Sequence, residues 1–206
     1  QQDGERVLAI TIGSGERPSP LRTTVNDRFY TLFQTPVFGR PDTYTALRDR
    51  DDPSTGTVED PDLLDVSAYL QGVDSADAQV VQLTLADKEG WYVDLPGTGE
   101  KVISSPTIFR GAVLFSAYQP TVQNDSCQAQ VGTSRVYQLS LGEGLPKDIT
   151  APLAEFLTEV PTPVNVSGIT SITLMNPEGG PTLLTGSTSQ SLPDLGIRIN
   201  YWRQDK

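Results

Sequence analysis

The sequence predicts an all-β fold, and three observations support that prediction. The chain of 206 residues contains 18 glycines and 16 prolines, the residues that most often end strands and form turns. Hydrophobic residues make up 36% of the chain and come in short β-branched runs, which is enough for a core. No run reaches the roughly 18 apolar residues that a membrane-spanning helix needs. We therefore expect blade-like antiparallel sheets with at most two short helices.

Two strands are expected near the start of the chain. The run from Val7 to Ile12 is apolar and leads into a turn at Gly13 to Gly15. The run from Arg28 to Phe33 alternates well enough to form a second strand of the same unit.

The composition then shifts to Asp, Pro, Thr and Ser from Gly39 to Ser75, which indicates an insertion. Within it, Asp60 can cap a helix and Pro61 suits the first helical position. Three leucines would face inward on that short helix: Leu63, Leu64 and Leu70.

Strands are expected to resume after this insertion, because apolar runs are again separated by short turn segments. Five are predicted: Val80 to Leu85, Gly90 to Leu95, Ile103 to Ile108, Ala112 to Tyr118 and Arg135 to Leu141. A second insertion, at about 146–164, has apolar residues at helical spacing between Asp148 and Val160, which predicts a second short helix. Two further strands, Gly168 to Met175 and Leu195 to Trp202, follow it.

Two stretches of the chain carry a resemblance to one known family. The first runs from Ile12 to Leu32 and contains the Gly13 to Gly15 turn, a Pro-Leu step and the strand Asn26 to Tyr30. The second runs from Gly90 to Gly144 and contains GWYVDLP, an EKV-x-S-x-P step and a G-x-V-x-F-S-x-Y strand. In this order the motifs resemble the C-terminal β-propeller of the PilY family, which comprises calcium-regulated factors at the tips of type IV pili.

The resemblance implies that residues 1–206 are the C-terminal portion of a quinoprotein-like β-propeller. Blades of roughly 40 to 50 residues allow about three to four of them in this length. We therefore expect a ring that does not close on itself, with the remainder of the propeller supplied by a companion chain or by further polypeptide. The family also ends shortly after a Trp-Arg pair, here Trp202-Arg203, so we expect the natural C-terminus. With neither a charged leader nor an apolar leader at Gln1, we expect a mature or excised piece.

The resemblance also implies a function without catalysis. Such a protein would be a pilus biogenesis factor and pilus-tip adhesin that supports assembly, surface attachment and twitching motility. Its partners would be minor pilins and a host or abiotic surface, and it would be exported through the periplasm to the cell surface. The alternative is a quinoprotein-like or carbohydrate-acting enzyme, because one propeller architecture hosts many functions.

Charge and composition exclude several classes of function. The 15 basic and 26 acidic residues give a net charge of −11, and the basic residues are scattered, so nucleic-acid binding is set aside. The chain has no histidine, which removes Ser-His-Asp and Cys-His catalysis and the usual zinc sites. Paired carboxylates could still perform acid–base chemistry, but no pair stands out.

Three groups of residues are candidates for a site. Asp49, Asp51 and Asp52 form a weak candidate calcium loop, but they lack calcium-loop spacing and the default is a solvated loop. The calcium loop of the family has no counterpart here, so we expect no cofactor in this chain. The lone Cys127 would pair with a residue outside the chain in an exported protein. The third group could stack on sugars, although core packing is the better interpretation: Trp91, Tyr92, Phe109, Phe115, Tyr118, Tyr137, Tyr201 and Trp202.

Overall fold

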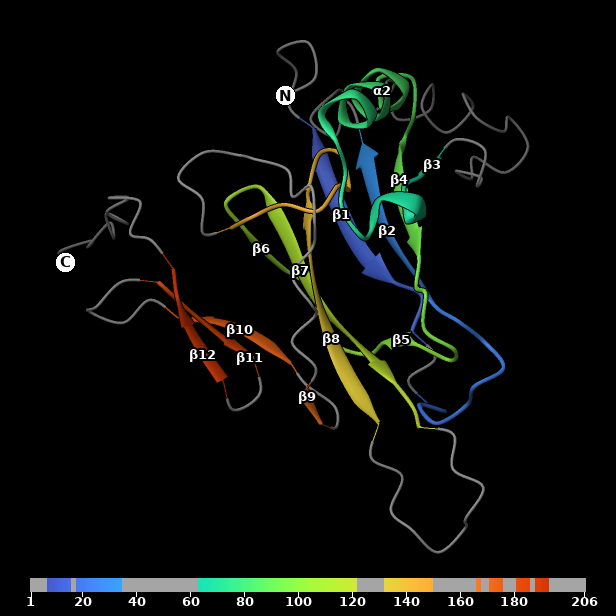
Figure 1. Cartoon of the computed structure of the whole chain (residues 1–206), viewed down its shortest axis with the longest axis vertical. Helices are drawn as coiled ribbons and strands as arrows, with labels where there is room; N and C mark the ends of the chain where they lie inside the picture. The colour runs from blue at the N-terminus through green and yellow to red at the C-terminus, as the bar shows by residue number, and fades with distance from the viewer. Residues whose placement is uncertain are drawn as a thin grey trace, which may run out of the picture.

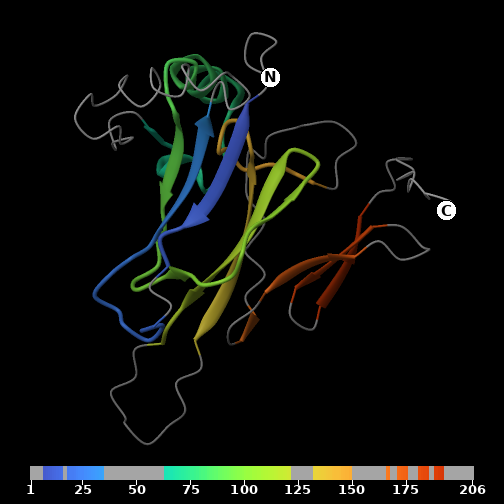
Figure 2. The same cartoon turned by 180° about the vertical axis from the view of Figure 1, so that it is seen from behind.

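Three β-sheets follow one another along the chain and lie side by side in space. The computed structural model describes residues 7–15, 18–34, 63–121, 132–149, 166–167, 171–175, 181–185 and 188–192. Within these ranges the second sheet lies between the first and the third, as both views show (Figures 1 and 2). The structure is thus mostly β, with several antiparallel pairings, and none of the sheets in the described ranges is closed.

The first sheet has the strand order β1-β2-β4-β3. Its strands are β1 (Leu8–Gly13), β2 (Arg28–Gln34), β3 (Leu63–Asp65) and β4 (Gly90–Asp94). The pairs β1·β2 and β2·β4 are antiparallel, and the predicted strands at Val7 to Ile12, Arg28 to Phe33 and Gly90 to Leu95 are confirmed. The pair β3·β4 is parallel, which differs from the wholly antiparallel sheets expected.

The prediction of a short helix after Asp60 is wrong for the part of it that the structure describes. Leu63–Asp65 forms strand β3, and Ser67–Tyr69 forms one 3₁₀ turn. Leu63 pairs with Gly90 and Leu64 with Trp91. These leucines therefore form a strand because they pair with the edge of β4. The apolar spacing suited a helix, but sheet pairing decides the conformation.

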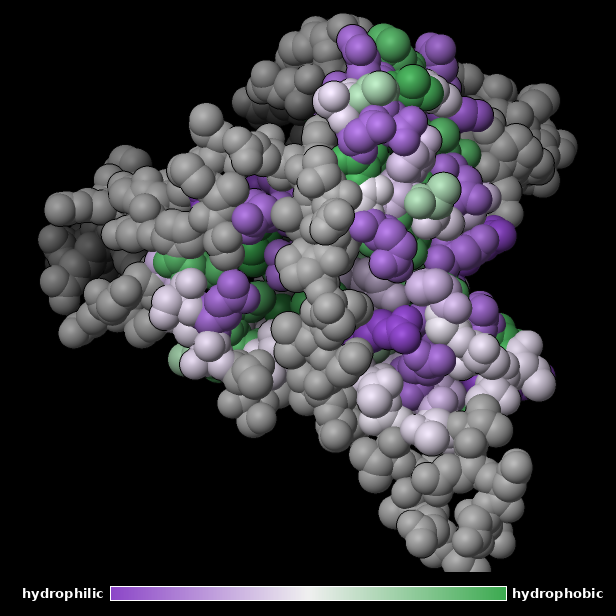
Figure 3. Space-filling view, viewed as in Figure 1, coloured by the Kyte–Doolittle hydropathy of each residue, from purple (hydrophilic) through white to green (hydrophobic). Residues whose placement is uncertain are grey.

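The strand predicted at Val80 to Leu85 is also wrong, because Ser75–Leu85 forms helix α2. The side chain of Asp74 caps this helix by accepting a hydrogen bond from the backbone N–H of Asp77 at 2.8 Å. Ala78, Val81 and Leu85 are buried at helical spacing, whereas Val80 and Leu83 are exposed. Figure 3 shows hydrophobic residues mixed with hydrophilic ones over α2. No helix in the described ranges is long and apolar enough to cross a membrane.

The second sheet is built around two long strands, β7 (Ala112–Gln119) and β8 (Thr133–Ser140). Strands β5 (Lys101–Val102) and β6 (Thr107–Phe109) both pair with β7, and β9 (Val166–Ser167) pairs with β8. The predicted strands Ala112 to Tyr118 and Arg135 to Leu141 are confirmed. The strand expected at Ile103 to Ile108 is confirmed only at its end, in β6, because residues 103–106 form no strand and β5 ends before them.

The third sheet has the order β10-β11-β12, formed by β10 (Ile172–Met175), β11 (Thr182–Thr185) and β12 (Thr188–Ser191). It confirms the C-terminal part of the strand predicted at Gly168 to Met175 and adds two strands that the sequence analysis did not predict. The strand expected at Leu195 to Trp202 lies outside the described residues, as does most of the helix expected from Asp148 to Val160.

The two faces of β7 contribute to two separate cores, which explains why this strand is buried along almost its whole length. Val113, Phe115 and Ala117 point into a core shared with the first sheet and α2. Ala112 and Leu114 point into a second core, shared with the third sheet through Ile172, Leu183 and Leu192. Because successive strand residues face opposite sides, one strand can join the two layers.

Candidate functional site

The two stretches that carry the family resemblance meet at one junction between the first and second sheets. We call this junction the clasp, formed by Val25 to Asp27 and Gly97 to Val102. Asn26 accepts a hydrogen bond from the backbone N–H of Gly99 at 2.7 Å, and Asp27 accepts one from Val102 at 3.0 Å. The backbone of Asp27 also donates to the carbonyl of Glu100 and accepts from Leu95. The Asn-Asp pair of the first stretch is therefore held by backbone groups of the second.

Glu100 and Lys101 are fully buried within the clasp, which is unusual for charged residues. The carboxylate of Glu100 accepts hydrogen bonds from the backbone N–H of Gly97 and the hydroxyl of Tyr137, both at 2.8 Å. The guanidinium of Arg135 lies 3.6 Å away and pairs with it. Lys101 donates to the carbonyl of Val25 at 3.1 Å. Both buried charges therefore have polar or charged protein partners, which reduces the cost of burying them.

Tyr137 is strongly affected by this environment. Burial, and then the negative charge and hydrogen bond of Glu100, raise the pKa of Tyr137 well above its ordinary value of 10.0. The phenol is therefore a hydrogen-bond donor to Glu100 and stays neutral across the physiological range.

Gly99 in the clasp and Gly15 beside it allow close backbone contact. A Cβ atom at Gly99 would lie 2.6 Å from the Cα of Thr23, and the φ of Gly99 is +67°. A Cβ atom at Gly15 would lie 2.3 Å from the carbonyl oxygen of Val102. The GSG and GTG turns in the resembling stretches thus let the two loops approach each other.

An aromatic stack continues from the clasp into the first core. The rings of Phe29 and Phe115 stack with centroids 3.8 Å apart, and Phe115 stacks on Tyr137 at 5.0 Å. Trp91 is buried beside Phe29 and donates its indole N–H to the carbonyl of Leu141 at 3.1 Å. These contacts join β2, β4, β7 and β8 into one unit.

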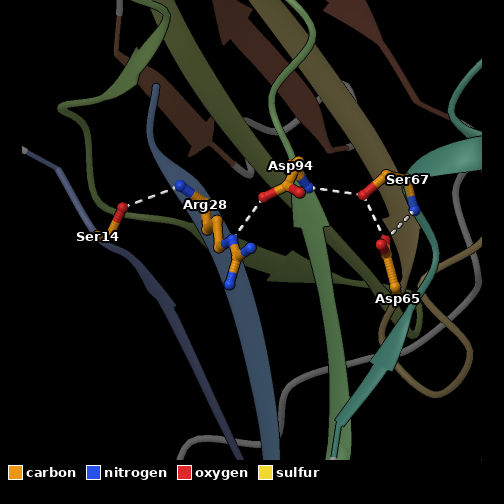
Figure 4. A network of polar contacts seen from close by, with 5 residues as sticks. All are labelled: Ser14, Arg28, Asp65, Ser67 and Asp94. Atoms are coloured by element: carbon orange, nitrogen blue, oxygen red, sulfur yellow. Dashed lines mark hydrogen bonds and ion pairs between the residues drawn. The ribbon is translucent and has the colours of Figure 1, made fainter. Parts of the chain in front are cut away.

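A second group of polar residues lies at the end of the first sheet and is partly exposed (Figure 4). Arg28 pairs with Asp94 at 2.5 Å and lies over the ring of Tyr92, 4.7 Å from its centroid. The backbone of Asp94 donates to the hydroxyl of Ser67, which donates in turn to Asp65. Partial burial, and then the charge of Asp65, raise the pKa of Tyr92. Each acid here already has a partner.

The two buried carboxylates of the clasp make structural contacts. Asp27 and Glu100 accept hydrogen bonds from backbone and phenol donors that hold loops in place. A catalytic carboxylate must instead reach a substrate. No group of three or more His, Cys, Asp and Glu residues that could hold a metal ion occurs in the described part of the chain. Asp49, Asp51, Asp52 and Cys127 all lie outside that part.

The aromatic residues considered for sugar stacking are mostly core residues, as expected. Trp91, Phe115 and Tyr118 are buried, and Phe109 packs against the second core. Tyr92 is half-buried and lies under the guanidinium of Arg28. Tyr201 and Trp202 lie outside the described residues.

Sequence reasoning did not single out Asn26, Asp27, Glu100 or Lys101 as individual residues. All four lie within the stretches that resemble the family. One signal could have identified them: polar residues next to glycine-rich turns often supply the hydrogen bonds that buried turn backbone requires.

The comparisons with known proteins give no relative. The chain matches no protein-family model, no curated protein and no solved structure.

Proposed function

We propose that the chain is the C-terminal portion of a PilY-type β-propeller that acts, without catalysis, as a type IV pilus biogenesis factor and pilus-tip adhesin. One observation carries this proposal. The two stretches that resemble the family, 58 residues apart at their nearest ends, come together in the clasp.

The contacts of the clasp explain why particular residues occur in those stretches. In Asn26 to Tyr30, Asn26 and Asp27 hold the second stretch, Arg28 pairs with Asp94, and Phe29 fills the core. In the second stretch, Glu100 and Lys101 are buried, and Gly99 permits close approach. Motifs that build one packed unit are more specific than motifs that match separately. This supports reading them as one propeller segment.

The layered sheets also suit a propeller segment. Blades of a propeller are small antiparallel sheets that pack face to face in chain order. The three sheets of this chain follow one another in that way, and the middle one is buried on both faces of β7.

A role in binding, with minor pilins and a host or abiotic surface as partners, agrees with the chemistry of the described residues. The chain has no histidine, and the carboxylates of the clasp are occupied by structural hydrogen bonds. In this proposal the protein is exported and works at the pilus tip, where it supports attachment and twitching motility. Calcium control, if the protein has it, would act through a loop elsewhere in the propeller.

Affinity purification from a piliated bacterium that encodes the chain tests the proposal. The tagged 206-residue chain should enrich minor pilins from the sheared surface and envelope fractions. The control is the same chain with Gly99→Val, because a side chain at this position collides with Thr23 and disrupts the clasp. Enrichment of minor pilins with the native chain alone is expected. Their absence from the native eluate would reject the pilus role.

A further inference from the structure

Two tyrosines of the first sheet, Tyr30 and Tyr92, lie side by side. They stand directly opposite each other on the antiparallel strands β2 and β4. Opposed residues of an antiparallel pair project from the same face of the sheet, and here the ring centroids lie 6.0 Å apart. Among the tyrosines that the structure describes, these are the two whose rings meet.

The tyrosine pair is held in place and is still reached by solvent. Both side chains are half-buried, so part of each is exposed. The guanidinium of Arg28 lies over the ring of Tyr92, 4.7 Å from its centroid, and is itself paired with Asp94. Two groups that a fold keeps adjacent react with each other far faster than the same groups free in solution.

A proton acceptor lies beside one of the two phenols. Tyr92 shares a side-chain hydrogen bond with Asp65. The carboxylate of Asp65 also accepts a hydrogen bond from the backbone N–H of Ser67 at 2.9 Å, which fixes its position. Removal of one electron from a phenol releases the phenolic proton, so a base within hydrogen-bond reach favours this oxidation.

The chain offers few side chains that an oxidant would attack before a tyrosine. Thiols and thioethers are the usual first targets, and the sequence contains one cysteine and one methionine. The methionine, Met175, lies on the third sheet. Trp91, which neighbours Tyr92 in the chain, is fully buried. The exposed parts of the tyrosine pair are therefore a favoured place for oxidation of the first sheet.

We propose that Tyr30 and Tyr92 form an oxidative cross-linking site, at which a one-electron oxidant of the peroxidase class joins the two rings by a carbon–carbon bond. Each phenol gives up one electron and one proton, and the two radicals couple at the ring carbons next to their hydroxyl groups. The hydrogens on these carbons then move to the oxygens, which restores both phenols. The chain loses two hydrogen atoms in total, and these reduce one hydrogen peroxide to two waters.

The new bond would tie β2 to β4 and close the chain between Tyr30 and Tyr92 into a loop. A covalent link of this kind removes conformations from the unfolded chain and so stabilises the folded one, as a disulfide does. The inference uses only the tyrosine pair and its surroundings, so it does not depend on the pilus role.

Limited treatment of the 206-residue chain with a peroxidase and hydrogen peroxide tests the proposal. Intact-mass spectrometry should show a monomeric chain that has lost two hydrogen atoms. After tryptic digestion, the peptide with Tyr30 should be joined to the peptide with Tyr92. The melting temperature of the cross-linked chain should exceed that of the untreated chain.

Conservative variants show whether this pair is the site. Tyr30→Phe and Tyr92→Phe keep the ring packing but remove one phenol, so each should abolish the product. Tyr69→Phe is the matched control, because Tyr69 is also half-buried and should leave the yield unchanged. Asp65→Asn removes the proton acceptor and should slow the cross-linking several-fold, whereas an unchanged rate would overturn the role given to Asp65.

Three outcomes would overturn the proposal itself. One is a treated chain with no link between Tyr30 and Tyr92. Another is cross-linking that occurs only between separate chains, which would mean that the two rings do not meet within one molecule. The third is a product that survives Tyr92→Phe, since the link would then belong to other tyrosines.

Discussion

Glu100 is the residue on which the buried hydrogen bonds of the clasp converge. It is fully buried, and it links Gly97 on its own loop to Tyr137 and Arg135 on β8. Removing the carboxylate leaves a backbone N–H, a phenol and a guanidinium without their acceptor. The cost of such a change exceeds that of losing a surface ion pair.

We expect Glu100→Ala to lower the free energy of unfolding by about 3 kcal/mol, measured by urea denaturation. Asp94→Ala is the matched control, because it removes a carboxylate of a half-exposed ion pair and should cost about 1 kcal/mol or less. Equal costs for the two substitutions would mean that the clasp is not the structural centre of the chain.

The raised pKa of Tyr137 predicts that the free energy of unfolding depends on pH under alkaline conditions. Its pKa is raised in the folded state, so the folded chain favours the neutral phenol. The stabilisation is therefore fully present below the ordinary value of 10.0 and is lost as the pH rises above it. The stability advantage of the native chain over Tyr137→Phe should shrink above pH 10 by up to about 1.4 kcal/mol per pH unit. Urea titrations between pH 8 and pH 11 would show a constant difference if this account is wrong.

Thr31 is a buried residue whose hydroxyl has no hydrogen-bond partner. Thr31→Val keeps the shape and the β-branching but removes the unsatisfied polar group. We therefore expect it to raise the free energy of unfolding by about 1 kcal/mol. Thr31→Ser, which keeps the hydroxyl and opens a small cavity, should instead lower it. Thermal denaturation of both variants checks the order, and a Val variant less stable than the native chain would contradict it.

At the scale of elements, alternation and glycine boundaries were sufficient to predict β1, β2, β4, β7 and β8. They failed where tertiary contacts override local preference. The β-branched run at Val80 to Leu85 suited a strand, but Asp74 caps it and its inward side chains recur at helical spacing. Leu63 and Leu64 suited a helix, but β4 offers a pairing edge. The burial of the charged residues in the clasp could not be predicted either, because Glu and Lys are usually exposed.

The GTG turn of the clasp allows a test at this scale with a matched pair of glycines. Gly99→Ala should lower the free energy of unfolding by more than about 1 kcal/mol, since it combines a positive φ with a 2.6 Å contact to Thr23. Gly142 has nothing within 4 Å of an added Cβ, so Gly142→Ala should be neutral or slightly stabilising. A Gly99→Ala variant as stable as Gly142→Ala would show that the loops do not meet as described.

At the scale of the whole molecule, the described residues form three sheets that pack on one another through two cores. The clasp fixes the first sheet against the second, and β7 joins the second to the third. A stack of this kind holds its loops in fixed positions, and loops on a rigid frame are where partners usually bind. This is the physical basis on which we propose a scaffold at the pilus tip.

Surface piliation of the bacterium that encodes the chain tests the central claim most directly. Pilin sheared from the cell surface is measured after deletion of the coding sequence for residues 1–206, and after its replacement by versions carrying Gly99→Val or Gly142→Ala. We predict that the deletion and Gly99→Val strongly reduce surface pilin, while Gly142→Ala leaves it at the native level. Native levels of surface pilin in the deletion strain would contradict the account.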